Sequence, residues 1–465
     1  MRPILPLRLL PLVLAAALTA GCAVGPAYQV PAAPTSTAFK AAAGWQAAAP
    51  ADALERGPWW TLFNDPVLNG LASQVAVSNQ NVAAAVASYA AARAAVAEQR
   101  ASLFPTVNLG LSGDRSGGRE QDSSSNYRLN IGGSWEPDVW GRLRAGVNSA
   151  SAGAAASAAD LASARLSAQG ELAVNYFAVR QSDAQKALLA TTLDGYQRVL
   201  TITRNRYEVG IVGKSDVLQA ETQLANARID ELSLTRQRAQ FENAIAILIG
   251  KAPANFALAS APWTANVPQV PVMVPSTLLE RRPDIAAAER RVAAANAQIG
   301  IARSAYYPNI GLSGSLGAGG SRIGDLFSAS NLLWSFGTSV AQSIFNAGAT
   351  RANVAMVEAQ HRVAVARYRQ TVLDAFGDVE NQLTATRVLA QQQVLRSQAS
   401  VAADQVEAQM LNRYKAGQVG YTEVVQAQAT ALSARRSLVQ SQADRQTTAV
   451  ALIQSLGGGW QASLK

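Results

Sequence analysis

The residue types that most often perform chemistry in proteins are scarce in this chain of 465 residues. It has one cysteine, Cys22, and one histidine, His361. A single cysteine excludes an internal disulfide framework and a cysteine-rich metal site. A single histidine, set in the helical run VEAQHRVAVARY, leaves no partner for a His-based catalytic pair. The phosphate-binding pattern GxxxxGK[ST] is also missing from the sequence. We therefore expect a protein that is not an enzyme and needs neither a metal nor a cofactor.

Cys22 lies at a position where lipid attachment is a possible chemistry. Two arginines precede the apolar run 9–18, and small residues follow it, which predicts a secretory signal over residues 1–21. The run is too short to span a bilayer as a helix. LTAGC resembles a bacterial lipobox, whose cysteine receives a diacylglycerol and becomes the new N-terminus. Ala23, where Asp would signal retention, then implies the outer membrane. The alternative is an ordinary secretory signal with an incidental cysteine; lipidation is favoured because the only cysteine stands at this position.

The composition favours long, closely packed helices. Hydrophobic residues make up 49% of the chain, which excludes disorder as the main state, while charged residues make up 15% and aromatics 6%. The formal net charge is +9, from 40 basic and 31 acidic residues. The arginines are dispersed along helical patterns without a basic tail, so nucleic acid is not an expected partner.

The sequence contains an internal duplication. Residues 206–228 match residues 413–435, and residues 100–113 match residues 303–315, with Pro105 opposite Pro308. Two matches over so long a separation indicate that one unit occurs twice. The matches differ in offset by four residues, and the loops 113–126 and 317–331 are the candidate site of that difference.

Each half predicts a helix, two strands, a long helix, a turn and a returning helix. About 65 residues of helix span roughly 98 Å, so we expect a rod or the wall of a tube instead of a compact globule. The expected helices are 81–104, 142–207 and 215–249 in the first half, and 284–307, 347–414 and 422–456 in the second.

Four short segments alternate between apolar and polar residues: 106–113, 127–135, 309–317 and 334–340. In the first of them, Val107, Leu109 and Leu111 share one face. Such alternation with aromatic ends is typical of transmembrane β-strands. Four strands cannot close a barrel, and an open edge in lipid leaves backbone groups unsatisfied. We therefore expect oligomers, with three copies giving twelve strands. The alternative is two ordinary hairpins in a soluble protein.

Three blocks resemble a known family: GCAVGPAYQVP (21–31), PWWTLFNDPVLNGL (58–71) and LLERRPDIAAAERRVAAANAQIGIARSAYYPNIGLSGSLG (278–317). The chain resembles the TolC superfamily of outer-membrane factors, and specifically the NodT-type lipoproteins that partner resistance-nodulation-division (RND) transporters. The resemblance implies a mainly α protein with a transmembrane β portion. It further implies a homotrimer with a 12-stranded β-barrel in the outer membrane, an α-barrel in the periplasm and an equatorial belt between them.

On this basis the chain divides into six expected segments. These are a signal peptide (1–21), a lipidated N-terminal and equatorial segment (22–66), a first repeat (67–265), an equatorial linker (266–282), a second repeat (283–456) and a C-terminal tail (457–465).

The repeated RY…G…VG segments predict two turns between helices. Glycines permit the tight turns, Ser215 and Thr422 are expected to cap the returning helices, and Asp216 and Glu423 fall in their first turns. Capping alone accounts for both acids. The resemblance implies a further role, in which the turns form a periplasmic gate and an adaptor-docking surface. The implied gate residues are Arg206, Tyr207, Asp216, Arg413, Tyr414 and Glu423, and the implied docking residues are Gly210, Val212, Gly213, Gly417, Val419 and Gly420.

The expected function is that of a passive channel for drugs or other small molecules. The resemblance implies a periplasmic adaptor, an inner-membrane RND transporter and outer-membrane lipid as partners. One alternative is the exit duct of a type I protein secretion system. Another, from a different class, is a structural periplasmic coiled-coil lipoprotein, which does not account for the alternating strands.

Overall fold

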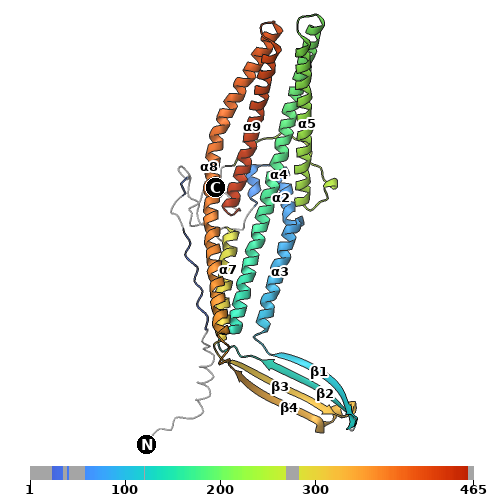
Figure 1. Ribbon diagram of the computed structural model, residues 1–465, viewed down its shortest axis with the longest axis vertical. Helices are drawn as coiled ribbons and strands as arrows, with labels where there is room; N and C mark the ends of the chain where they lie inside the picture. The colour runs from blue at the N-terminus through green and yellow to red at the C-terminus, as the bar shows by residue number, and fades with distance from the viewer. Residues whose placement is uncertain (1–23, 35–38, 41–57, 120, 269–281, 459–465) are drawn as a thin grey trace. The chain divides into compact units, whose positions relative to one another are not determined.

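The computed structural model describes residues 24–34, 39–40, 58–119, 121–268 and 282–458 (Figure 1). The α-helices are α2 (Pro66–Ser78), α3 (Gln80–Ala101), α4 (Arg142–Glu208), α5 (Lys214–Leu248), α7 (Pro283–Ser304), α8 (Ala349–Lys415) and α9 (Tyr421–Ser455). The strands are β1 (Thr106–Gly118), β2 (Gln121–Trp135), β3 (Asn309–Gly320) and β4 (Leu332–Ala341). Short 3-10 helices are η1 (Trp59–Phe63), η2 (Pro253–Asn255), η3 (Ile323–Phe327) and η4 (Ala329–Asn331). Among the described helices, none has an apolar stretch long enough to cross a membrane.

The predicted elements are present in the predicted order, and each half contains the same series. The strands are longer than expected, and the second hairpin (309–341) is longer than the first (106–135), which accounts for most of the four-residue difference between the repeats. Both returning helices are followed by a glycine with positive φ, Gly250 at 70° and Gly457 at 92°, a residue type that commonly ends helices in this conformation.

Helix α2 was not predicted from the sequence. It is separated from α3 by one extended residue, Asn79 (φ −69°, ψ 125°). The Asn79 side chain donates to the Leu248 carbonyl at 2.8 Å and accepts from the backbone N–H of Val82 at 3.1 Å. A single buried asparagine therefore ends one helix and caps the next, a role that Asn favours at helix N-termini.

The chain divides into two compact units, each built from three stretches. One comprises Met1–Ala33, Ala87–Ala159 and Ala287–Gln370; the other comprises Pro34–Val86, Asp160–Ala286 and Thr371–Lys465. The first holds the sheet, and the second holds both turns between helices.

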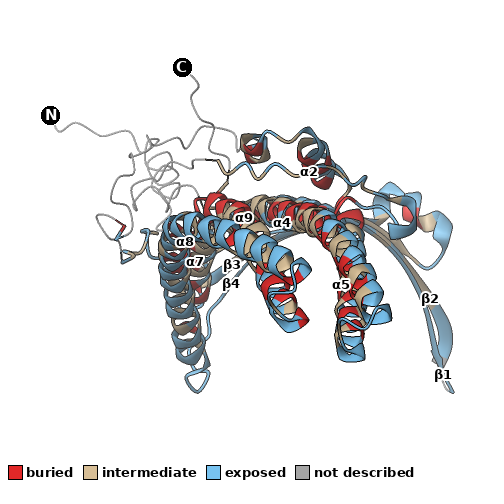
Figure 2. Ribbon diagram, turned by 90° about the horizontal axis from the view of Figure 1, so that it is seen from above, coloured by how far each residue is buried: buried red, intermediate tan, exposed pale blue. Residues whose placement is uncertain are grey.

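The sheet in the first unit is antiparallel with the order β1-β2-β3-β4. Its register places Leu109 opposite Ile131, Ile131 opposite Leu316, and Leu316 opposite Trp334. Each of these four side chains is at least half exposed. Strands β1 and β4 are almost entirely exposed, whereas most residues of β3 are of intermediate exposure. Figure 2 colours each residue by its burial. The alternation seen in the sequence thus produces an apolar row that crosses all four strands, and the described residues leave this row exposed.

An extended N-terminal segment, residues 24–33, also belongs to the first unit. The Val24 N–H donates to the Trp140 carbonyl at 3.4 Å, and Asn296 donates to the Pro26 carbonyl at 3.0 Å. Gly25 is so close to Gly300 of α7 that a Cβ on Gly25 would lie 2.9 Å from the Gly300 Cα. The sequence therefore needs glycine at this crossing.

Candidate functional site: the two turns between helices

The two turns have the same backbone. In the first, Gly210 has φ 77°, its N–H donates to the Tyr207 carbonyl at 2.9 Å, and the Ile211 N–H donates to the Arg206 carbonyl at 2.8 Å. In the second, Gly417 has φ 75° and makes the matching bond to the Tyr414 carbonyl, also at 2.9 Å. This is the Schellman pattern, in which a left-handed glycine ends a helix and satisfies its last carbonyls. The duplication in the sequence is thus a duplication in structure.

The expected caps of the returning helices are wrong. The N-cap residues are Gly213 and Gly420, both extended and neither making a side-chain cap bond. Ser215 and Thr422 lie inside the first helical turn, because each helix begins one residue earlier than predicted, at Lys214 and Tyr421. An extended glycine ranks only slightly below serine as an N-cap, so it competes successfully for the position.

Asp216 and Glu423 do lie in the first turns of their helices, as predicted. A carboxylate there is favoured by the positive end of the helix dipole. Neither makes an ion pair within the described ranges of one chain. An ion pair that the sequence did not suggest, Arg204–Glu221 at 2.6 Å, joins α4 to α5 near the first turn, and both its side chains are largely exposed.

An apolar core supports both turns. Four of its residues come from α4, five from α5, one from α8 and two from α9. They are Leu189, Tyr196, Val199, Leu200, Val217, Ala220, Leu224, Ala227, Leu234, Tyr414, Tyr421 and Val424. Two residues for which the sequence implied a docking role, Val212 and Val419, are half-buried, and Val419 packs against this core. The two hairpins, α4–α5 and α8–α9, are therefore held together in one chain.

A polar contact between the hairpins, close to the turns, joins Arg206 to Tyr414. An Arg206 Nη donates to the Tyr414 carbonyl at 2.6 Å, and the guanidinium carbon lies 4.6 Å from the centre of the Tyr414 ring. The Tyr414 hydroxyl is 3.2 Å from the Thr203 hydroxyl, and its ring lies 5.6 Å from that of Tyr421. Tyr414 is only 1% exposed, so these interactions take place away from water. A cation over a desolvated ring can contribute about 2 kcal/mol.

The equivalent residues of the other repeat are in different surroundings. Tyr207 is 43% exposed, whereas Tyr414 is buried. Arg413 is exposed, and within the described residues no hydrogen bond or ion pair involves its side chain. The structure therefore brings Arg206 and Tyr414 together and leaves Tyr207 and Arg413 apart.

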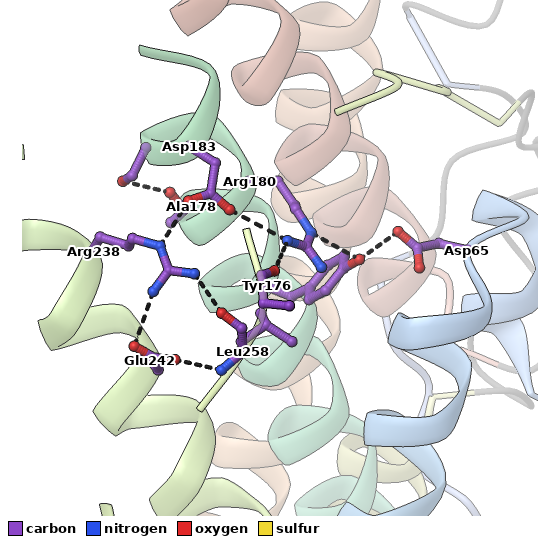
Figure 3. A network of polar contacts seen from close by, with 10 residues as sticks. Asp65, Tyr176, Ala178, Arg180, Asp183, Arg238, Glu242 and Leu258 are labelled. Carbon is purple, nitrogen blue, oxygen red and sulfur yellow. Dashed lines mark hydrogen bonds and ion pairs between the residues drawn. The ribbon is translucent and has the colours of Figure 1, made fainter. Parts of the chain in front are cut away.

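A buried polar network lies further along α4 (Figure 3). The Tyr176 hydroxyl donates to Asp65 at 2.6 Å, while the other Asp65 oxygen caps α2. Arg180 donates to the Tyr176 hydroxyl at 3.1 Å and to the Ala259 carbonyl at 2.8 Å. Burial, and then the bond to Asp65, raises the pKa of Tyr176 to about 12.

The same network continues to α5. Asp183 lies between two arginines, 3.3 Å from Arg180 and 2.6 Å from Arg238. Arg238 also pairs with Glu242 at 3.0 Å and donates to the Leu258 carbonyl. These charges attach the segment after α5 to both helices. Sequence analysis missed the network, since its members are single charged residues in helices without a distinguishing spacing.

Comparison with known proteins identifies the family. Residues 71–251 and 274–458 match the model of the family described as outer membrane efflux protein. The chain is 32% identical to the probable efflux pump outer membrane protein TtgC of Pseudomonas putida, over 97% of this chain and 96% of TtgC. It is 30% identical to the outer membrane protein OprJ of Pseudomonas aeruginosa, over 96% and 94%.

Solved structures of outer-membrane channels are similar to this chain over most of its length. The outer-membrane channel OprN superposes with a TM-score of 0.86 at 30% identity, covering 95% of this chain and 100% of OprN. The open state of the MtrE outer membrane channel of Neisseria gonorrhoeae gives 0.84 at 29%, covering 94% and 98%. The chain belongs to the outer membrane efflux protein family, which confirms the predicted resemblance. It is an outer-membrane component of an efflux system.

Proposed function

We propose that three copies of this chain form a passive channel that conducts drugs or other small molecules across the outer membrane. The exposed apolar face of the sheet, combined with its two open edges, is the observation that carries the proposal. β1 and β4 are the outer strands, and each pairs on one side only within the described chain. In lipid such edges must be satisfied, and joining three sheets edge to edge gives a closed wall of twelve strands.

A lipid anchor on Cys22 accords with this placement. Cys22 itself lies outside the described residues, but Val24 is bonded to Trp140. The Trp140 ring stacks on Tyr307 at 4.9 Å, and its N–H donates to the Pro308 carbonyl at 2.7 Å, immediately before β3. Aromatic residues at the ends of membrane strands favour the lipid–water interface. An acyl group on Cys22 would therefore enter the bilayer close to the level at which the strands enter it.

The channel would obtain its energy and substrates from partners. The sequence has no nucleotide-binding loop of the GxxxxGK[ST] type, and TtgC and its relatives are named as components of efflux pumps. We therefore assign a periplasmic adaptor and an inner-membrane RND transporter as partners, and favour small-molecule efflux over protein secretion.

The two turns would serve as the gate and the docking surface. Arg206, Tyr207, Asp216, Arg413, Tyr414 and Glu423 would hold neighbouring helices together at the closed end. Gly210, Val212, Gly213, Gly417, Val419 and Gly420 would shape the surface that meets the adaptor. Val209 and Ile211 support docking there, because they are 70% and 62% exposed at the first turn. Adaptor binding would open the gate by making contacts available only in the dilated state.

Single-channel recording tests both assignments. The purified trimer should form pores in planar bilayers, and the double substitution Asp216→Ala, Glu423→Ala should raise their conductance. Glu221→Ala is the matched control, since Glu221 is an acid on the same helix α5 as Asp216 that pairs with Arg204 at the surface. Unchanged conductance in the double variant would remove the gate assignment, and a wild-type trimer without pores would remove the channel.

A further inference from the structure

Only half of a duplicated contact is formed within one chain. The sequence Arg-Tyr occurs at the end of α4 (Arg206, Tyr207) and again at the end of α8 (Arg413, Tyr414). Arg206 and Tyr414 bind each other, whereas Arg413 and Tyr207 remain exposed. The exposed pair contains the same two chemical partners, an arginine and a tyrosine at a helix C-terminus.

The backbone carbonyl of Tyr207 can accept the same two hydrogen bonds that the backbone carbonyl of Tyr414 accepts. The Tyr414 carbonyl receives two donors, the Gly417 N–H at 2.9 Å and Arg206 at 2.6 Å. The Tyr207 carbonyl receives the matching Gly210 N–H, also at 2.9 Å, which leaves its second lone pair available. Both carbonyls lie at the negative end of a helix dipole, where a guanidinium is favoured.

Helix geometry separates the two halves of each Arg-Tyr pair. Consecutive residues of an α-helix project about 100° apart around its axis. Tyr414 faces the first hairpin of its own chain, so Arg413 is directed to a different neighbour. The same holds for Tyr207 beside Arg206.

We propose that Arg413 binds Tyr207 of a second copy of this chain, as Arg206 binds Tyr414 inside one chain. The proposal rests on the trimer of the proposed function. Because repeat one contacts repeat two within a chain, and repeat two then contacts repeat one of the next copy, the contact is head-to-tail and closes into a ring. Three contacts within chains would alternate with three between chains.

The contact between copies has weaker support than the contact within a chain. Thr203, which bonds the Tyr414 hydroxyl, corresponds in the second repeat to Met410. Tyr421, whose ring packs against Tyr414, corresponds in the first repeat to Lys214. When the turns separate, the contacts between copies therefore break before the contacts within each chain.

Cross-linking of the full-length protein tests the proposal. Cys22 is the only native cysteine, and a diacylglycerol attached to its sulfur through a thioether would leave no thiol to react. The variant Tyr207→Cys, Arg413→Cys, treated in membranes with a short bis-maleimide, should give covalent dimers and trimers on a denaturing gel. The matched control Arg206→Cys, Tyr414→Cys should link within one chain and stay at the monomer position, as should each single-cysteine variant.

The outcomes are distinguishable. If native mass spectrometry finds a trimer and the control pair links, but Tyr207→Cys, Arg413→Cys gives no covalent oligomer, the proposed contact is wrong while the channel remains. If the wild-type protein is monomeric in detergent, the proposed function fails and the contact fails with it.

A second measurement needs no cysteine. Arg413→Gln and Tyr207→Leu should each lower the temperature at which the trimer dissociates, and the double variant should lower it by less than their sum, because both remove one interaction. Tyr207→Phe should have little effect, since Met410 offers its hydroxyl no partner of the Thr203 kind, whereas Tyr414→Phe loses the bond to Thr203. Strictly additive effects of Arg413→Gln and Tyr207→Leu would contradict the proposal.

Discussion

At the scale of single residues, two charged side chains of α4, Arg180 and Asp183, lie almost completely inside the protein. Arg180 and Asp183 are 4% and 6% exposed, and their neighbours satisfy them with carboxylate, guanidinium, hydroxyl and carbonyl groups. A buried charge is tolerated only when it is paired and hydrogen-bonded in this way. Tyr176 connects this network to α2 through Asp65.

Tyr176→Phe should lower the free energy of unfolding by about 1–3 kcal/mol at neutral pH, because it removes a buried hydroxyl bonded to charged groups. Its effect should also depend on pH. The pKa of Tyr176 is raised from 10.0 to about 12, so the folded protein keeps a proton that the unfolded chain releases. The stabilisation is complete below pH 10 and is lost between about pH 10 and pH 12.

Thermal unfolding from pH 8 to pH 12 measures this dependence. Tyr176→Phe should flatten the fall in stability above pH 10, though not abolish it, since burial also raises the pKa of Tyr196 and Tyr421. Tyr207→Phe is the control at an exposed position. A variant whose stability falls with pH as steeply as the wild type would show that Tyr176 is not the titrating group.

The surroundings of equivalent residues in the two repeats could not be predicted from the amino-acid sequence. Arg206 and Arg413 are the same residue type in the same local sequence, as are Tyr207 and Tyr414. One of each pair is involved in a contact between hairpins because of tertiary packing, which the repeated sequence does not encode locally. The cap positions failed for a related reason: serine and glycine are both good N-caps, and their competition is decided by backbone geometry.

At the scale of elements, the two turns depend on left-handed glycines. Gly210→Ala should destabilise the first hairpin by about 1–2 kcal/mol, the cost of a left-handed backbone for a residue with a Cβ. The effect should be one of backbone strain alone, because a Cβ at Gly210 would meet no atom within 4 Å.

The control is Gly213→Ala, at an N-cap with φ −78° and ψ 159°, a conformation that alanine adopts freely. It should lower the unfolding temperature less than Gly210→Ala. Equal shifts for the two variants would mean that the left-handed conformation is not what the first turn requires.

The elements themselves were largely predictable. Pro105 and Pro308 ended helices, alternation marked the strands, and the repeat allowed one half to check the other. The break at Asn79 was not predicted, because the helical pattern continues on both sides and only the tertiary bond to the Leu248 carbonyl reveals the role of the side chain. The largest boundary differences are at the ends of α3 and α7, which stop at Ala101 and Ser304, three residues before the predicted ends at 104 and 307.

At the scale of the whole molecule, the apolar face of the sheet decides whether the protein enters a membrane. Leu109→Arg should reduce folding into the outer membrane by roughly 2–4 kcal/mol if the side chain lies near the bilayer midplane. Asn108→Arg, one residue earlier and on the opposite face, should be tolerated. Membrane fractionation together with a urea titration in lipid vesicles measures both.

Equal behaviour of the two variants would contradict the assignment of the exposed row to lipid. The sequence alone predicted this face, because period-two alternation sorts side chains regardless of what covers them. That this face belongs in the outer membrane follows from family membership.

If Cys22 carries a lipid anchor, the crossing of Gly25 over Gly300 would limit how far the protein can move from the membrane leaflet. If Cys22 carries the acyl chains, three Cα–Cα steps separate it from Gly25, so the tether between lipid and this crossing spans at most about 11 Å. So short a tether would fix the depth of α7 below the lipid headgroups. A larger side chain at position 25 would loosen that attachment while leaving the pore walls intact.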